Sequence, residues 1–188
     1  MQYQTISFGE GKEKIELTLL DNLMDLSLGG MISSPMFNEN IAIVVEDNPE
    51  TIDYDFACLG YTKEKTAPRV MMKSEFFDAL KRGTPESRTI LFHEIGHYVN
   101  GDILTNEGNT DAEREALVAD NKVSEKEIKA DAFAVAYLGK DAVIAGLEGL
   151  KKRILTEYAD YDEDSIRITI KEIDIRISHI KGLEDKNE

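Results

Sequence analysis

Residues 93–97, HEIGH, place two histidines and a glutamate at a spacing that suits metal-dependent hydrolysis. They lie in the middle of a helix that we predict over residues 85–100. At about 100° per residue, His93 and His97 project within roughly 40° of one another, which suits two imidazoles that bind one zinc ion. Glu94 lies at the edge of this face, where its carboxylate could accept a proton from metal-bound water without being a ligand. The pattern therefore predicts His93 and His97 as metal ligands and Glu94 as the catalytic base.

Histidine is rare in this chain, which makes the spacing informative. The sequence has three histidines in 188 residues, so a chance match to HExxH is expected in well under roughly 1% of such sequences. The opposite arc of the helix is apolar, and we expect it to pack inward while the histidines face a cleft. The apolar residues of that arc are Leu91, Phe92, Ile95, Tyr98 and Val99.

A catalytic zinc ion needs a third protein ligand, with the fourth position left for water. A metzincin would have glycine and histidine where this chain has Asn100 and Ile103, which excludes that class. His179 is the only other histidine, and its place among the isoleucines of the last helix favours a packed or surface role. Glu127 is the better candidate for the third ligand.

Glu127 and Asp131 are four residues apart on a predicted helix, so their carboxylates share a face. One can bind the metal while the other orients a ligating imidazole. Ala130 and Ala134 are small enough to let this helix approach the histidine helix closely. The Ser124-x-x-Glu127 spacing also matches a capping box, and the two roles compete for the same carboxylate. We favour the ligand role, because the histidines otherwise lack a partner of suitable spacing.

From about residue 55 to residue 183 the chain resembles the gluzincin peptidases of the HtpX and CAAX prenyl protease type, including their soluble minigluzincin relatives. The matching segments are DFAC at 55–58, RVMM at 69–72, HEIGHYVNGD at 93–102, EIKADAFAVAYLG at 127–139 and the closing helix at 176–183. An HExxH motif followed by this later ExxxD motif is more specific than HExxH alone.

The resemblance implies a zincin-like fold, with zinc on His93, His97 and Glu127, Glu94 as general base, and Asp131 supporting the ligands. It also implies that a strand near residues 55–59 forms the upper rim of the cleft and pairs with an extended substrate.

The chain departs from the family at several positions. It has no transmembrane helices, Asp55 stands where such proteins usually have Asn, and the His-Pro pair before the last helix is missing. These departures leave the residue that stabilises the transition state unassigned, with Tyr98, Tyr137 and His179 as candidates. Peptide deformylases pair a similar helix with an upstream cysteine, but Cys58 lacks their flanking pattern, and we interpret it as an ordinary buried thiol.

Alternation of apolar and polar residues predicts a β-rich first third and a helical remainder. Strands are expected over residues 2–8, 14–20, 41–46, 55–59 and 69–73, the first two as a hairpin, whereas residues 21–40 are ambiguous. Helices are expected over residues 74–82, 85–100, 111–120, 124–138, 141–155 and 165–183. We predict one α+β domain over residues 1–188, with a small mixed sheet packed on the HExxH helix, a β-rich part at 1–53 and a frayed tail at 184–188.

Composition limits the possible partners and location. The chain carries 37 Asp and Glu against 22 Lys and Arg, a net charge of -15, which disfavours binding to nucleic acid or to anionic lipid. One cysteine cannot form an internal disulfide, and neither a secretory signal nor a run of roughly 20 apolar residues is visible. A soluble, cytoplasmic protein is therefore expected.

The leading hypothesis is a soluble zinc metalloendopeptidase that acts on peptide or protein substrates. The alternative is an inactive zinc-binding regulatory or interaction module of the same fold, which the missing His-Pro pair would favour. A metal-free structural protein is a third possibility.

Overall fold

The described part of the chain contains six α-helices and one mixed sheet of six strands, which is an α+β arrangement. The computed structural model describes residues 2–21, 28–48, 57–61, 67–102, 110–157 and 162–183. The strands are β1 (Tyr3–Phe8), β2 (Ile15–Leu20), β3 (Leu28–Ser33), β4 (Ile41–Val45), β5 (Ala57–Tyr61) and β6 (Pro68–Met72). The helices are α1 (Ser74–Arg82), α2 (Pro85–Asn100), α3 (Asp111–Ala119), α4 (Glu125–Leu138), α5 (Lys140–Glu157) and α6 (Glu163–Gly182).

The sheet has the order β1-β2-β3-β4-β6-β5, with β5 at one edge. All neighbours are antiparallel except β4 and β6, which run parallel. The predicted hairpin of β1 and β2 is confirmed, with Tyr3 opposite Leu20, and a short 3-10 helix (Gly11–Glu13) lies in its turn. The ambiguous stretch contains β3, and the strand expected at 55–59 is β5, while residues 55 and 56 lie outside the described part.

One face of the sheet carries the core, as the alternating patterns of β2, β4 and β6 require. Ile15, Leu17 and Leu19 of β2 are fully buried, and every second residue of β4 and β6 is buried as well. These side chains form one cluster with apolar residues of α1, α2, α5 and α6. The histidine helix therefore rests on the same core as the sheet.

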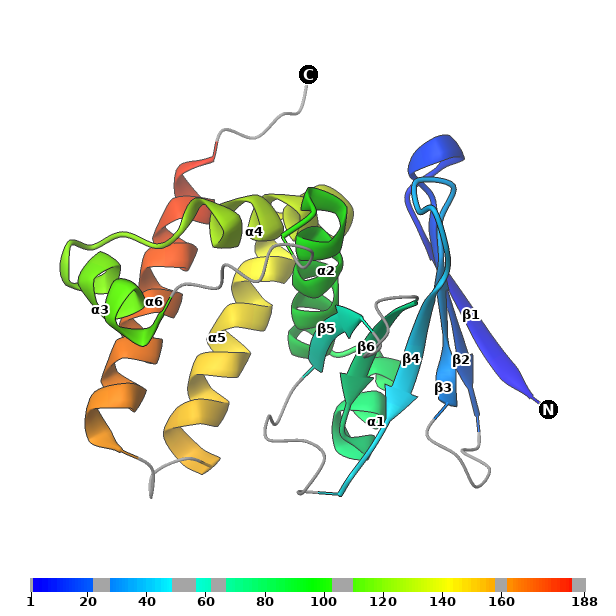
Figure 1. Ribbon diagram of the computed structural model, residues 1–188, viewed down its shortest axis with the longest axis horizontal. Helices are drawn as coiled ribbons and strands as arrows, with labels where there is room; N and C mark the ends of the chain where they lie inside the picture. Colours follow the sequence, from blue (N-terminus) through cyan, green and yellow to red (C-terminus); the bar gives the residue numbers. More distant parts are fainter. Residues whose placement is uncertain are drawn as a thin grey trace.

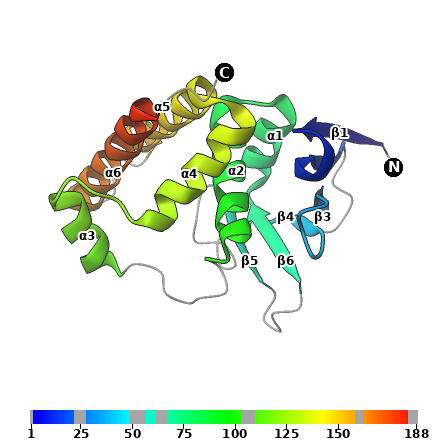
Figure 2. The ribbon, with the colours of Figure 1, turned by 90° about the horizontal axis from the view of Figure 1, so that it is seen from above.

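Figure 1 shows α2 between the sheet and the pair α5 and α6, and Figure 2 shows α1 and α2 next to the strands. Helix α2 packs most extensively on α4 and α5, and α5 packs on α6. All six predicted helices are confirmed to within about two residues at each end. Helix α4 contacts both α2 and α6, so it brings together segments that are far apart in the sequence.

The apolar arc of α2 packs as predicted except at its end. Leu91, Phe92 and Ile95 are fully buried. Val99 is 42% exposed, so its predicted burial was wrong. The reason is its position in the last turn, one residue before the end of the helix at Asn100.

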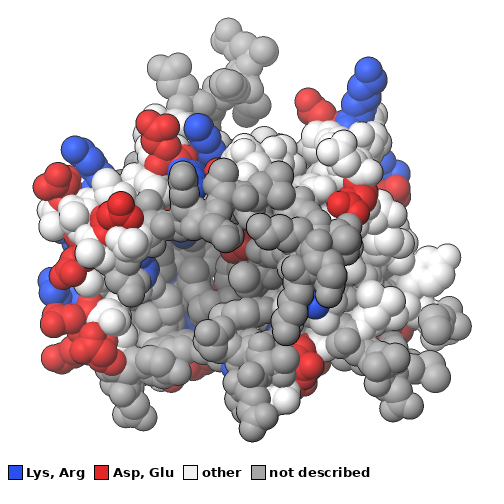
Figure 3. Space-filling model, in the orientation of Figure 1, with Lys and Arg blue, Asp and Glu red and all other residues white. Residues whose placement is uncertain are grey.

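Acidic side chains are prominent on the surface. Figure 3 shows them along the side of the molecule that carries α3 and α6, with lysines and arginines interspersed. Within the described residues, no helix has both the length and the apolar character needed to cross a membrane.

Candidate metal centre

Helix α2 positions both histidines of the HExxH motif. Thr84 caps its start by accepting a hydrogen bond from the backbone N–H of Ser87, and Pro85 occupies the first helical position. Gly101 ends the helix in the left-handed conformation, with a φ of 77°. Because these signals fix both ends, His93 and His97 lie one turn apart on the same side of a regular helix.

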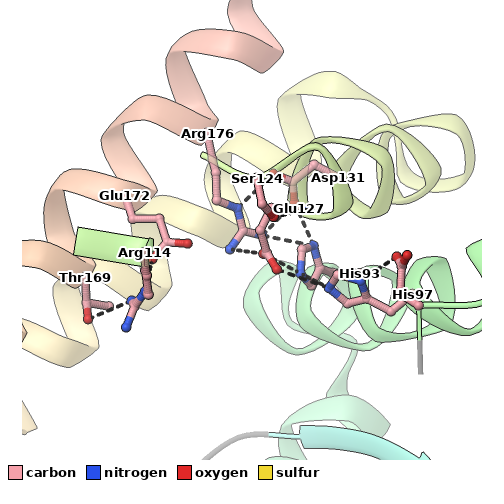
Figure 4. A network of polar contacts seen from close by, with 10 residues as sticks. His93, His97, Arg114, Ser124, Glu127, Asp131, Thr169, Glu172 and Arg176 are labelled. Atoms are coloured by element: carbon pink, nitrogen blue, oxygen red, sulfur yellow. Dashed lines mark hydrogen bonds and ion pairs between the residues drawn. The ribbon is translucent and has the colours of Figure 1, made fainter. Parts of the chain in front are cut away.

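The imidazoles of His93 and His97 converge with the Glu127 carboxylate. The two Nε2 atoms are 3.0 Å apart. Glu127 Oε2 lies 3.1 Å from Nε2 of His93, and Oε1 lies 3.4 Å from Nε2 of His97. In this group the possible ligand atoms all lie within 4.8 Å of one another, so the three residues could hold a metal ion. Figure 4 shows the histidines projecting from α2 toward Glu127 on α4.

Small residues allow α4 to lie against α2. Ala130 and Ala134 are fully buried, in agreement with the close approach of the two helices that was predicted from their small size. A Cβ atom added to Gly96, inside the HExxH motif, would lie 2.8 Å from Ala130 Cα and 3.0 Å from its carbonyl oxygen. Only glycine fits at this position without moving the helices. The motif thus supplies both two histidines and the close contact that brings Glu127 to them.

Glu127 divides its two predicted roles between backbone and side chain. Its backbone N–H donates to Ser124 Oγ at 3.4 Å, which caps the start of α4. Its carboxylate lies at the two histidines, and Arg176 Nη1 approaches it at 3.5 Å. The competition expected between capping and ligation is therefore avoided, because Ser124 performs the capping.

Asp131 supports His93 from the side away from Glu127. Its Oδ1 accepts a hydrogen bond from His93 Nδ1 at 2.8 Å, and the aspartate is only 2% exposed. Arg176 of α6 donates from Nε to Oδ2 at 2.8 Å and from Nη2 to Oδ1 at 2.6 Å. His93 Nδ1 and Arg176 Nη2 lie 3.0 Å apart because both donate to the same oxygen. Because Asp131 fixes one proton on Nδ1, His93 turns Nε2 toward the centre, where its lone pair would be available to a metal ion that replaces the Nε2 proton.

Asp102 supports His97 in the same way. The turn at Gly101 folds the chain back, and the Asp102 backbone N–H donates to the carbonyl of His97 at 3.0 Å. This turn brings Asp102 Oδ2 to 3.1 Å from His97 Nδ1. Each imidazole therefore has a carboxylate at Nδ1 and directs Nε2 toward Glu127.

These contacts shift several pKa values. Burial and the charge of Arg176 act to lower the pKa of His93, but hydrogen bonds to Asp131 and Glu127 outweigh them and raise it to about 9. Burial also disfavours the charged form of His97, yet its contact with Glu127 raises its pKa. Burial acts to raise the pKa of the Glu127 and Asp131 carboxyls. The two histidines nevertheless hold the pKa of Glu127 well below its usual range. Arg176 and His93 hold the pKa of Asp131 at about 2.

Burial opposes the charge of Arg176 as well, but the carboxylates of Asp131 and Glu127 raise its pKa, so it stays protonated. The centre thus contains two ionised carboxylates and one permanent cation. A metal ion would add to this balance by replacing the protons at Nε2 of the histidines.

We refer to His93, His97 and Glu127 as the triad. A pocket of about 430 Å³ opens beside it. Glu94, the predicted base, lines it together with His93, His97 and Glu127. The rest of the pocket is lined by Thr89, Ile90, Arg114, Leu147, Leu150, Ile154, Thr169, Glu172, Ile173 and Arg176. The predicted base and the predicted ligands therefore share one cavity with helices α3, α5 and α6.

The three candidates for stabilising a transition state are absent from the described lining of this pocket. Tyr98 packs edge-on against Phe37, and the Tyr137 hydroxyl donates to the backbone carbonyl of Glu13 at 2.8 Å. His179 is exposed on α6, in agreement with the surface role considered for it. The structure therefore brings none of the three to the triad.

Two other predicted residues fall outside the description. Asp55 is not among the described residues, and Cys58 lies in β5, where the side chain is not described. Their predicted roles stay predictions.

Two residues of the centre were missed by sequence reasoning, Arg176 and Asp102. Arg176 lies three residues after Ile173 and four before Ile180, which are both buried. An arginine at the edge of an apolar stripe is a signal for a buried ion pair. Asp102 follows the Asn100-Gly101 helix end, and a carboxylate just after such a turn can reach back to the last turn of the helix.

Comparison with family models, with curated proteins and with solved structures found no match to this chain. Its function has to be inferred from the residues of the site.

Proposed function

We propose that this protein is a zinc-dependent metalloendopeptidase with a zincin-like fold, of the gluzincin type. The observation that carries the proposal is the convergence of His93, His97 and Glu127 in one pocket with Glu94. Two imidazoles and one carboxylate are a ligand set of catalytic zinc, which keeps its fourth position for water or substrate.

The distances within the triad fit zinc. Zn–N and Zn–O bonds of about 2.0–2.2 Å in a tetrahedral arrangement place ligand atoms about 3.3–3.5 Å apart. The two Nε2 atoms are 3.0 Å apart, and each lies near a different oxygen of Glu127, that of His93 at 3.1 Å from Oε2 and that of His97 at 3.4 Å from Oε1. Taken as one ligand atom per residue, the three atoms lie within 4.8 Å of one another, which is close enough to surround one ion. The carboxylates of Asp131 and Asp102 at the two Nδ1 atoms are the support that ligating histidines usually have.

A bound zinc ion would supply an acidified water and a Lewis acid for the scissile carbonyl. In our proposal Glu94 accepts a proton from the attacking water and then delivers it to the leaving amine. Arg176 keeps Asp131 ionised and Asp131 keeps His93 in the ligating tautomer. The peptide would lie along β5, the edge strand next to α2, which could extend the sheet by one strand.

The test is the Glu94→Gln variant, measured for zinc content and for cleavage of an unfolded protein substrate. We expect one zinc per chain in both the native sequence and the variant, and cleavage by the native sequence alone. Cleavage that persists in the pure variant would sink the proposal.

A matched variant, Glu127→Ala, tests the ligand set independently. It should lower zinc affinity strongly, and an unchanged affinity would refute the ligand role of Glu127. Zinc bound at one per chain without cleavage of a diverse peptide library would instead support a non-catalytic zinc-binding module.

A further inference from the structure

The pocket beside the triad has an apolar part that the chemistry of Glu94 does not use. Three helices line it with aliphatic side chains: Ile90 from α2, Leu147, Leu150 and Ile154 from α5, and Ile173 from α6. Its volume of about 430 Å³ lies within the range of roughly 300–1,000 Å³ that ligand sites occupy. The whole pocket is therefore large enough for a side chain of a bound peptide, which could lie against these aliphatic residues.

A charged pair from two helices borders the same pocket. Arg114 of α3 donates from Nε to Glu172 Oε2 at 2.5 Å and from Nη2 to Thr169 Oγ1 at 3.0 Å, both on α6. The Glu172 side chain is only 13% exposed, and that of Arg114 is 37% exposed. Figure 4 shows the pair beside Arg176 and Glu127.

The cations of the pocket are already compensated. Arg114 is matched by Glu172, and Arg176 is matched by Asp131 and Glu127. A charged substrate side chain would lose water on entering, and among the described lining residues of α3 and α6 it would find each charged group already paired. An aliphatic or aromatic side chain would not lose the hydration of a charge, and it would contact the five aliphatic residues.

We propose that this pocket binds a large uncharged side chain of the peptide substrate, and that the Arg114–Glu172 pair is its specificity-determining element. The inference rests on the proposed peptidase function and adds the class of substrate. The proposal predicts an effect of each residue of the pair, because removal of either one leaves the charge of the other uncompensated at the pocket. Loss of Arg114 should then favour a basic side chain, and loss of Glu172 an acidic one.

The experiment uses blocked hexapeptides that differ only at one position, occupied by Leu, Phe, Lys or Glu, with that position moved along the peptide in turn. Binding is measured by calorimetry on the zinc-loaded Glu94→Gln chain, and cleavage is measured on the zinc-loaded native sequence. At one position, Leu and Phe should be preferred over Lys and Glu by about tenfold or more.

The charge variants are made in the same background. Arg114→Gln should shift the preference about tenfold toward Lys, and Glu172→Gln should shift it about tenfold toward Glu. The double variant should restore the preference for Leu and Phe. Arg167→Gln is the matched control, because Arg167 pairs with Asp164 on α6 with both side chains more than 70% exposed, and it should change nothing.

A second pair of variants tests whether the pocket itself is occupied. Leu150→Trp fills the cavity and should abolish the preference for Phe. Leu155→Trp lies on the same helix but at a position that is 54% exposed, so it should leave the preference intact. Equal effects of the two tryptophans would overturn the inference.

The outcomes separate this inference from the proposed function. Side-chain preferences that stay the same in both single charge variants would overturn it, even where cleavage occurs. An equal loss of binding for all four peptides, not restored in the double variant, would show that the pair only supports the fold and would also overturn it. Charge-switched binding without cleavage by the native sequence would contradict the peptidase function and leave the pocket assignment standing.

Discussion

Arg176 donates two hydrogen bonds to Asp131, from Nε to Oδ2 at 2.8 Å and from Nη2 to Oδ1 at 2.6 Å. Oδ1 also accepts the proton of His93 Nδ1 at 2.8 Å. Through this carboxylate, α6 is connected to the histidine helix, although Arg176 and His93 are 83 residues apart in the sequence. The docking of the last helix and the geometry of the candidate metal centre are therefore coupled.

Replacement of Arg176 by Gln should destabilise the protein strongly. Asp131 is 2% exposed, and without the guanidinium its charge would be buried with too few partners. Breaking a buried pair in this way costs about 3–5 kcal/mol. We expect a loss of this size in the free energy of unfolding, measured by urea denaturation at neutral pH.

Arg167→Gln is the control for this measurement. Arg167 pairs with Asp164 at 2.8 Å on the same helix, but both side chains are largely exposed, so its loss should leave the free energy of unfolding nearly unchanged. Adding Asp131→Asn to Arg176→Gln removes the uncompensated charge and should recover part of the loss. Similar effects of the two arginine variants would contradict the structural role of Arg176.

Asp131→Asn alone should weaken zinc binding by about 10- to 100-fold, as for other groups that orient a ligating histidine. The amide would keep the shape of the side chain but lose the charge that holds His93 Nδ1 protonated. Affinity is measured by competition with a chromogenic chelator. Asp102→Asn should act in the same direction through His97. Unchanged affinity in both variants would show that neither carboxylate positions a ligand.

Sequence patterns predicted the parts of the fold whose signals are local. Helix α2 begins after Thr84 with Pro85 and ends at Gly101, as expected from these residues. Periodicity located the other helices. The strand β3 was not predicted, since glycines interrupt its alternation. A Cβ atom at Gly29 would lie 2.7 Å from Val45 and 2.9 Å from Phe77, so a tertiary contact explains this glycine.

In the candidate centre, too, local sequence patterns predicted some residues and tertiary contacts determine the others. His93, His97 and Glu127 could be proposed from spacing within two helices. Arg176 and Asp102 depend on how α6 docks and on how the chain turns after α2, which no spacing within one helix reveals. The structure groups Glu127, and not His179, with the two histidines, and the role of Glu127 as a metal ligand stays a prediction.

Gly96→Ala should disturb the centre without touching a ligand. The added methyl group would press on the backbone of Ala130 at 2.8 Å, and a backbone contact cannot yield as a side chain can. Overpacking of this kind typically costs about 1–3 kcal/mol, and moving α4 would also move Glu127. We expect lower stability together with weaker zinc binding, measured by thermal unfolding and by chelator competition.

Gly149→Ala is the matched control on α5. The nearest atom to its added Cβ would be 3.5 Å away, which is an ordinary contact. Alanine is favoured over glycine within a helix by roughly 1 kcal/mol, so this variant should be neutral or slightly stabilising and should bind zinc normally. Equal behaviour of the two variants would contradict the close packing of α2 on α4.

The stability of the chelator-treated protein should fall as the pH rises from 6.5 to about 9.5. The pKa of His93 is raised from 6.5 to about 9, so the folded chain holds this proton more tightly than the unfolded chain does. Such a group contributes its full stabilisation below the unfolded pKa and loses it as the pH passes through the folded pKa. The raised pKa of His97 acts in the same direction. The lowered pKa values of Glu127 and Asp131 contribute only to a loss at acidic pH, outside this window.

We expect a decrease on the order of 2 kcal/mol in the free energy of unfolding, measured with urea, between pH 6 and pH 9.5. His93→Gln should reduce this decrease, and zinc should reverse it, because the metal binds the deprotonated imidazoles and its affinity rises with pH. Stability that rises across the window in the chelated protein would contradict the contacts described for His93.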